Sequence, residues 1–216
     1  AGSCCVIEER LVGREVSAMA LVDGERVLML PTAMDYKRRN EGDTGLMTGG
    51  MGAISPAPGM SEEILLEIRT RILEPTVHEL RDKGGSFVGL LYAGVMLTEN
   101  GPMLLEFNCR FGDPETQVVV PRIAQDFYEL LLATARGHHT TEKVLEGRNE
   151  AVVNIVLCAK QYPEKLCGAC VAPDQSAVAF AFIAVSSFLM SSGDSCGRST
   201  LIVSLLSFAV SANGGW

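Results

Sequence analysis

Three polar residues alternate along an otherwise apolar stretch. Glu106, Asn108 and Arg110 lie two residues apart within 103–115, MLLEFNCRFGDPE. Because alternate side chains of a β-strand share a face, we expect these three on one face and the intervening residues on the other. A carboxylate and an amide oxygen on a rigid strand suit Mg²⁺, which takes few protein ligands and keeps positions for phosphate and water. The pattern predicts a metal site with an anion contact beside it, the alternative being an ordinary exposed ion pair.

The flanking residues predict a β-hairpin that presents this stretch. Residues 87–98 form an apolar run with strand character, and the turn sequence Glu99-Asn100-Gly101-Pro102 leads back into 103–115. Further strands are expected at 5–9, 15–22, 26–30 and 151–160. Asp23-Gly24 tolerates positive φ and predicts a tight turn between the second and third of these.

Helical periodicity appears in three places. Ser61 is a suitable N-cap, and apolar residues repeat at helical spacing after it until Pro75, which should break or kink the helix. A second segment should then reach Leu80. Helices are also expected at 115–124 and 126–136, with Gly137 ending the last one.

Residues 35–58 show neither helical nor strand period and are rich in glycine. They match neither the P-loop pattern nor the dinucleotide fingerprint. Successive glycine amides can nevertheless turn toward one anion, and Lys37, Arg38 and Arg39 add positive charge nearby. The alternatives are an anion-binding loop and a flexible surface loop.

The composition limits the kinds of partner. The chain has 216 residues, 47% of them hydrophobic, and a formal net charge of -8. No basic stripe exists to neutralise a nucleic-acid backbone, so we expect no nucleic-acid partner. Seven irregularly spaced cysteines do not resemble a secreted disulfide framework. With neither a signal sequence nor an initiator Met at the start, we expect a fragment of a cytoplasmic protein.

The composition changes near Lys165. Residues 166–216 contain ten serines and only three charged residues. Their longer apolar run, 177–190, is shorter than the roughly 20 residues of a spanning helix and contains serines, so we expect no membrane partner. We therefore divide the chain into a domain at 1–165 and an apolar, serine-rich tail at 166–216.

Three segments together resemble the glycinamide ribonucleotide synthetase (phosphoribosylamine-glycine ligase) family. They are VIEERLVGREVS at 6–17, MDYKRRNEGDTGLMTGGMGAISPAP at 34–58 and LLYAGVMLTENGPMLLEFNCRFGDPE at 90–115. The resemblance extends over about residues 1–163. It implies an α+β fold, the C-terminal portion of an ATP-grasp domain.

The resemblance also assigns the nucleotide and metal positions. The residues that match the family's adenine hinge are Glu8, Glu9, Arg10 and Leu11. Glu15 resembles the acid that holds the ribose hydroxyls, while Glu106 and Asn108 resemble the metal ligands below the ATP phosphates. The implied cofactors are ATP and Mg²⁺ or Mn²⁺.

Further residues match positions close to the phosphoribosyl substrate. They are Lys37, Gly49, Gly50, Arg110 and Asp113. Arg110 is also the implied catalytic residue. The implied reaction joins glycine to phosphoribosylamine through a glycyl phosphate, with ATP, glycine and phosphoribosylamine as small-molecule substrates, within what is expected to be a larger multidomain polypeptide.

Several features depart from the family pattern. Leu46-Met47 stands where the family commonly has Pro-Asn, and Tyr36 replaces a His. The family's upstream phosphate loop with its lysine is not in this sequence, and the tail is unlike the family's C-terminal domain. We therefore expect this fragment to be inactive alone. The alternative is a non-catalytic fragment that binds a nucleotide, or whose tail engages a membrane or a partner.

The change in composition generates a solubility prediction. A chain ending at Lys165 should be more soluble than the full chain, because an exposed apolar tail promotes association. Sedimentation of the two chains across a concentration series measures this. Equal solubility would mean that the tail packs, and that the proposed boundary is misplaced.

Overall fold

The structure, a computed structural model, describes residues 5–138, 144–145, 147–158, 162–163 and, by backbone alone, 202–204. Most of the predicted tail therefore lies outside the described residues. None of the described helices has the length and apolar character needed to span a membrane. The described cysteines Cys5, Cys109 and Cys158 are free thiols.

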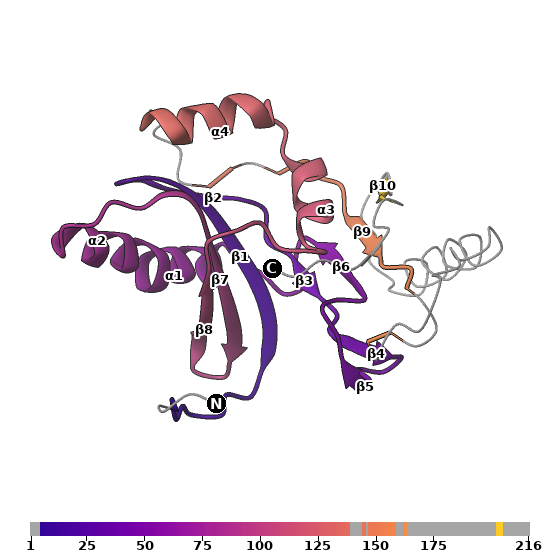
Figure 1. The fold of residues 1–216 in the computed structure, drawn as a ribbon. Coiled ribbons are helices and arrows are strands. Elements are labelled where there is room, and N and C mark those ends of the chain that lie inside the picture. Colours follow the sequence, from indigo (N-terminus) through magenta and orange to yellow (C-terminus); the bar gives the residue numbers. More distant parts are fainter. Residues whose placement is uncertain (1–4, 139–143, 146, 159–161, 164–201, 205–216) are drawn as a thin grey trace.

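The main sheet has four antiparallel strands in the order β2-β1-β7-β8 (Figure 1). Its strands are β1 (Arg14–Asp23), β2 (Val27–Met29), β7 (Val88–Thr98) and β8 (Gly101–Asn108). Both predicted hairpins are confirmed. Gly24, with φ of 98°, stands in the β1–β2 turn, where a left-handed backbone favours glycine.

A second sheet has the order β10-β9-β6-β3, and a separate hairpin is formed by β4 and β5. These strands are β3 (Met34–Asp35), β4 (Arg38–Asn40), β5 (Thr44–Met47), β6 (Gly52–Ser55), β9 (Val152–Ile155) and β10 (Ile202–Ser204). The region 35–58, expected to lack strand structure, thus contains several short strands. The period-two signal fails there because the strands are two to four residues long.

Helices cover both faces of the main sheet. They are α1 (Glu62–Ile68), the π-helical η1 (Arg69–Leu73), α2 (Glu74–Asp82), α3 (Thr116–Val119), the 3₁₀ turn η2 (Val120–Arg122) and α4 (Phe127–Arg136). Residues of α1 to α2 pack with Val16, Ala18 and Val95 on one face. Residues of α3 and α4 pack on the other, against Met19 and Leu21.

The helix signals in the sequence are largely confirmed. Ser61 caps α1 by accepting from the backbone N–H of Ile64 at 3.3 Å, and Asp126 caps α4 in the same way. Gly137 ends α4 in the left-handed conformation. Pro75 does not interrupt the helical run, because η1 precedes it and Pro75 falls in the first turn of α2, where a missing N–H is tolerated.

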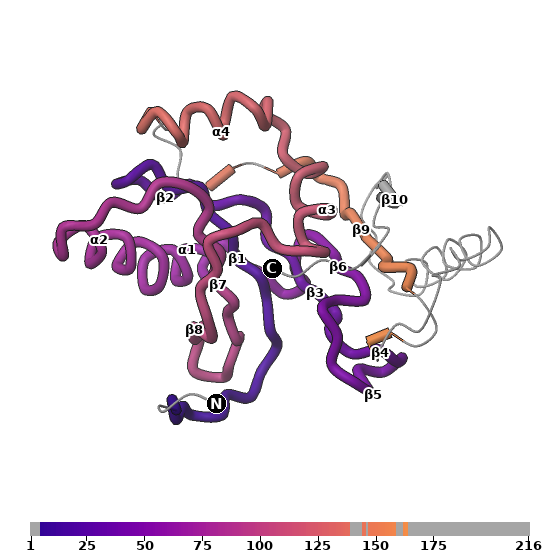
Figure 2. The backbone as a smooth tube through the Cα atoms, viewed as in Figure 1, coloured from indigo at the N-terminus to yellow at the C-terminus, as the bar shows by residue number. Residues whose placement is uncertain are grey.

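The predicted strand at 5–9 is wrong. Residues 5–12 have no regular structure and run into β1 beside the turn of the β7–β8 hairpin (Figure 2). Val6 and Ile7 are 83% and 91% exposed. Their β-branched side chains favour an extended chain, but no described strand pairs with them there.

Candidate functional site

Strand register brings the predicted metal ligands to one face of the main sheet. Across β1, β7 and β8, Ser17 pairs with Gly94 and Gly94 with Glu106, while Tyr92 pairs with Asn108. Asn108 Nδ2 donates to Glu106 Oε1 at 3.1 Å, so these two side chains point the same way as predicted. We call this side of the sheet the polar face.

A bulge in β8 determines which residues reach the polar face. Gly94 pairs with Glu106, but the next residue of β7, Val95, pairs with Leu104, which leaves Leu105 unpaired. Leu104 and Glu106 therefore lie on opposite faces although they are two residues apart. The expected alternation of side chains between the two faces holds from Glu106 to Asn108, but the bulge interrupts it between Leu104 and Glu106.

Gly94 keeps the centre of this face open. A side chain here would stand between Ser17 of β1 and Glu106 of β8, and a Cβ on Gly94 would lie 3.4 Å from Glu106 Cγ. Glycine inside a strand often marks the close approach of a ligand or another backbone. The sequence alone points to Gly94 by this rule, because Gly94 lies inside the strand predicted at 87–98.

Lys37 reaches the polar face from the connection after β3. Ser17 exchanges two backbone hydrogen bonds with Ala33, at 2.8 and 3.1 Å, which aligns the chain after Ala33 with β1. Lys37 Nζ forms an ion pair with Glu15 Oε1 and lies 3.9 Å from Asp35 Oδ2. Burial alone would lower the pKa of Lys37, but the carboxylates of Glu15, Asp35 and Glu106 hold it above its usual value.

Asp35 is a buried carboxyl that the sequence did not single out. Its side chain is 4% exposed, and burial raises its pKa to about 6. Lys37 opposes that shift, while the carboxylates of Glu115 and Glu15 add to it. Asp35 therefore adds a group that titrates at mildly acidic pH beside the polar face.

Arg110 and Asp113, the other predicted site residues within 103–115, lie after the end of the strand. Strand β8 ends at Asn108, and Arg110 is exposed, with Nη1 donating to its neighbour Phe111 O at 3.1 Å. Arg110 is thus not part of the strand, contrary to the prediction that it shares a strand face with Glu106 and Asn108. Asp113 Oδ1 accepts from Gln117 Nε2 at 2.7 Å and is exposed as well.

The glycine-rich region approaches this segment. Gly50 packs against Pro114, where a Cβ would lie 2.5 Å from Pro114 Cδ. The amides of the glycine pair already have acceptors: Gly49 N–H donates to the Tyr162 hydroxyl at 2.9 Å, and Gly50 N–H to Thr48 Oγ1 at 3.0 Å. The two amides therefore do not converge on one common acceptor.

The predicted adenine hinge stands apart from these groups. Glu8, Glu9 and Arg10 are exposed and Leu11 is half-buried, all within the irregular segment 5–12. The structure thus brings together Glu15, Lys37, Glu106 and Asn108, and it leaves residues 8–11 without a described contact to them.

Among the described residues, no group of three or more His, Cys, Asp or Glu side chains could hold a metal unaided. Glu106 and Asn108 offer two oxygen ligands of the kind that Mg²⁺ prefers. Both remain accessible, Glu106 exposed and Asn108 half-buried, which leaves room for phosphate and water.

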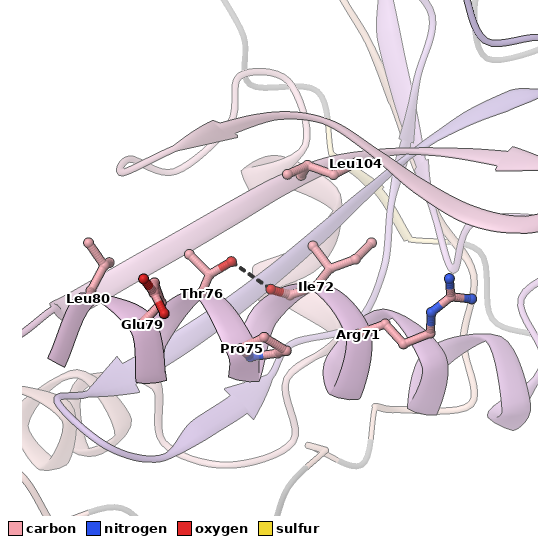
Figure 3. Close-up of a pocket in the computed structure, with 7 residues that line it drawn as sticks. All are labelled: Arg71, Ile72, Pro75, Thr76, Glu79, Leu80 and Leu104. Atoms are coloured by element: carbon pink, nitrogen blue, oxygen red, sulfur yellow. Dashed lines mark hydrogen bonds between the residues drawn. The ribbon is translucent and has the colours of Figure 1, made fainter. Parts of the chain in front are cut away.

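An apolar pocket lies on the opposite side of the sheet (Figure 3). It has a volume of about 490 Å³ and is lined by Arg71, Ile72, Pro75, Thr76, Glu79, Leu80 and Leu104. Ile72 belongs to the core beneath α1 and α2, and Leu104 pairs with Val95 of the same core. The pocket is therefore separate from the polar face.

Comparison with known proteins identifies a family and several relatives. The ATP-grasp (A) domain of phosphoribosylglycinamide synthetase matches residues 1–116. The human trifunctional purine biosynthetic protein adenosine-3 is 47% identical over 163 residues, 76% of this chain and 16% of that protein. The phosphoribosylamine–glycine ligase of Caldanaerobacter subterraneus is 47% identical over 162 residues, 75% of this chain and 39% of the relative.

A solved structure shows the same fold. The crystal structure of phosphoribosylamine–glycine ligase from Thermotoga maritima is 37% identical, with a TM-score of 0.66. The match covers 73% of this chain and 39% of that one. The chain thus spans less than half the length of these relatives.

The buried position of Asp35 generates a prediction about stability and pH. Below about pH 4, Asp35 is protonated in both the folded and the unfolded state, so burial of its charge costs nothing. Between about pH 4 and pH 6 the unfolded state has released this proton while the folded state still holds it, so stability falls as the pH rises, and the loss is complete above about pH 6. A pKa raised from 3.8 to about 6 corresponds to on the order of 3 kcal/mol at neutral pH.

Asp35→Asn should remove this loss. Its stability relative to the unaltered chain should therefore increase between about pH 4 and pH 7, as measured by urea unfolding. Asp82→Asn, the same substitution at an exposed residue of α2, is the matched control. A stability difference for Asp35→Asn that stays constant across this range would contradict the assignment.

Proposed function

The chain belongs to the phosphoribosylglycinamide synthetase family and has part of the ATP-grasp fold, and from this we propose that it supplies the nucleotide- and magnesium-binding face of an ATP-dependent phosphoribosylamine–glycine ligase. One observation carries the proposal. Glu15, Glu106 and Asn108 share the polar face around side-chain-free Gly94, with Lys37 beside them.

In this proposal the nucleotide lies along β1. Adenine contacts residues 8–11, and Glu15 accepts hydrogen bonds from the ribose hydroxyls. The ribose must then compete with Lys37, whose ammonium group pairs with Glu15 in the structure. Lys37 thereby becomes available to the phosphoribosyl substrate, because a ribose bound to Glu15 weakens the pairing of Glu15 with this ammonium group.

Glu106 and Asn108 hold Mg²⁺ in this proposal. Asn108 Nδ2 faces Glu106 Oε1 in the structure, so the Asn108 amide must turn to offer its oxygen. Mg²⁺ held there would supply positive charge that offsets the negative charge of the phosphates. Two protein oxygens are enough for such a site, because Mg²⁺ takes few protein ligands.

The proposed reaction activates the carboxylate of glycine. A glycine oxygen forms a bond to the γ-phosphorus as the bond from that phosphorus to ADP breaks, which gives glycyl phosphate. The amine of phosphoribosylamine then attacks the carbonyl carbon, loses a proton and displaces inorganic phosphate. Phosphoryl transfer depends mainly on alignment and charge neutralisation, so no Ser or Cys nucleophile is needed.

The residues around Arg110 bind the second substrate in this proposal. Arg110 is the catalytic cation that offsets developing negative charge, and Lys37 and Asp113 contact the phosphoribosyl group. Gly49 and Gly50 shape the loop against Pro114 and contribute their amides if the substrate displaces Tyr162 and Thr48. The reactive acyl phosphate also requires exclusion of water, which a closing loop provides.

The complete reaction needs more than this chain. The chain spans 39% of the Caldanaerobacter ligase, so we propose that it is inactive alone and acts as part of a longer polypeptide in the cytoplasm. The boundary near Lys165 and the separate tail at 166–216 remain part of this proposal.

Glu106→Gln tests the metal assignment. Replacing a carboxylate ligand with a neutral amide should lower the affinity for ATP in the presence of Mg²⁺ by about tenfold or more and leave Mg²⁺-free binding unchanged. Isothermal calorimetry with ATP, in Mg²⁺ and in EDTA, measures both affinities.

Glu99→Gln, at the exposed turn of the same hairpin, is the matched control. Equal Mg²⁺-dependent affinity in the Glu106 variant and the unaltered chain would remove Glu106 from the site. Failure of the unaltered chain to bind ATP would contradict the proposal for this chain.

A further inference from the structure

The carboxylate of Glu115 lies buried against the polar face. Glu115 is 4% exposed, and it forms no ion pair with a described residue. Its Oε1 atom accepts hydrogen bonds from the Tyr92 hydroxyl and, at 3.3 Å, from Ser17 Oγ. The two hydroxyl oxygens are 2.8 Å apart. A buried carboxylate is costly unless hydrogen-bonded, so these hydroxyls are what stabilises Glu115 there.

Both hydroxyls belong to strands of the proposed site. Ser17 follows Glu15 by two residues and shares its face of β1. Tyr92 lies directly opposite Asn108 in the register of β7 and β8. The carboxylate of Glu115 therefore links β1, which carries Glu15, to β7, which pairs with the strand of the proposed metal ligands.

Glu115 also stands at the end of the segment 109–114, which leaves β8 directly after Asn108. The backbone of Gly112 packs closely against the Glu115 side chain, since a Cβ on Gly112 would be 2.5 Å from Glu115 Oε2 and 3.0 Å from Tyr92 Cε1. Gly112 O accepts from Thr116 N–H at 3.1 Å, which closes the segment onto the start of α3. The segment is thus fixed at Glu115.

The exposed side chains of this segment have only local partners among the described residues. Arg110 donates to Phe111 O, and Asp113 accepts from Gln117. We propose that Glu115 is a positioning residue, whose buried carboxylate, held by Tyr92 and Ser17, sets the position of the segment 109–114 and so of Arg110 and Asp113. The roles of Arg110 and Asp113 rest on the proposed function, whereas the fixing of the segment does not.

Tyr92→Phe in the full chain tests the proposal, because it removes one hydroxyl and keeps the ring. Without ligand, amide hydrogen exchange in 110–119 should become about tenfold faster, since hydrogen bonds to charged groups are among the stronger ones. Exchange in β1 and β7 should not change. Affinity for ribose 5-phosphate, measured by calorimetry, should fall about threefold to tenfold although Tyr92 touches no ligand, because Arg110 and Asp113 bind the phosphoribosyl group in the proposed function.

Tyr128→Phe on α4, at a tyrosine that is 67% exposed, is the matched control. Glu115→Ala should reproduce the faster exchange, and adding Tyr92→Phe to it should have no further effect, because both act through one carboxylate. Glu115→Gln should retain part of the protection through its amide oxygen. Should Glu115→Ala fail to fold, Glu115→Gln replaces it in the same double-variant comparison.

Unchanged exchange in 110–119 would overturn the proposal, and so would faster exchange spread evenly over the strands, which is the result of a general loss of stability. Faster local exchange with unchanged affinity for ribose 5-phosphate would also overturn the positioning role. If the unaltered chain binds no ribose 5-phosphate, the proposed function fails separately, and the exchange data still decide whether Glu115 fixes the segment.

Discussion

The in-register pairing of β1, β7 and β8 is the constraint on which the site depends. In antiparallel pairing a shift of one residue moves every side chain of a strand to the other face. The bulge at Leu105 performs such a shift inside β8, because regular pairing beyond Val95 and Leu104 would place Glu106 opposite Ala93, within the core beneath α1. The bulge therefore allows apolar Leu104 to face that core while Glu106 faces the polar side.

Charge on the polar face follows from the same arrangement. Glu15, Asp35 and Glu106 all act on Lys37, and burial keeps the pKa of Asp35 high. Three carboxylates beside one ammonium group leave negative charge that a bound cation would offset. A magnesium nucleotide brings both a cation and hydroxyl donors, so it would satisfy Glu106 and Glu15 at once. This is the physical link between the geometry and the proposed ligase function.

Local sequence signals predicted part of this structure well. Turn residues at Asp23-Gly24 and 99–102, the cap at Ser61, the helix end at Gly137 and the alternation from Glu106 to Asn108 act over a few residues and are confirmed. The strand expected at 5–9 was wrong because extended character is not sufficient without a partner strand. The place of Arg110 was missed because the end of β8 depends on its pairing with β7.

Contacts between distant segments were beyond these signals. The network of Ser17, Tyr92 and Glu115 joins residues up to 98 positions apart, and no local period marks them as neighbours. The short strands within 35–58 likewise depend on partners such as β9. Family resemblance predicted the α+β fold and the identity of the family, because it uses information from the whole length of 1–163 and not from local periods alone.

Paramagnetic broadening by Mn²⁺ with ADP, followed by NMR on the full chain, tests the central claim most directly. The account predicts that broadening is strongest at Glu106 and Asn108, extends to the amide of Gly94 and reaches Glu15 more weakly, while α2, which packs beyond the opposite face, is much less affected. Broadening centred on acidic residues away from the polar face, or spread evenly over exposed carboxylates, would contradict it.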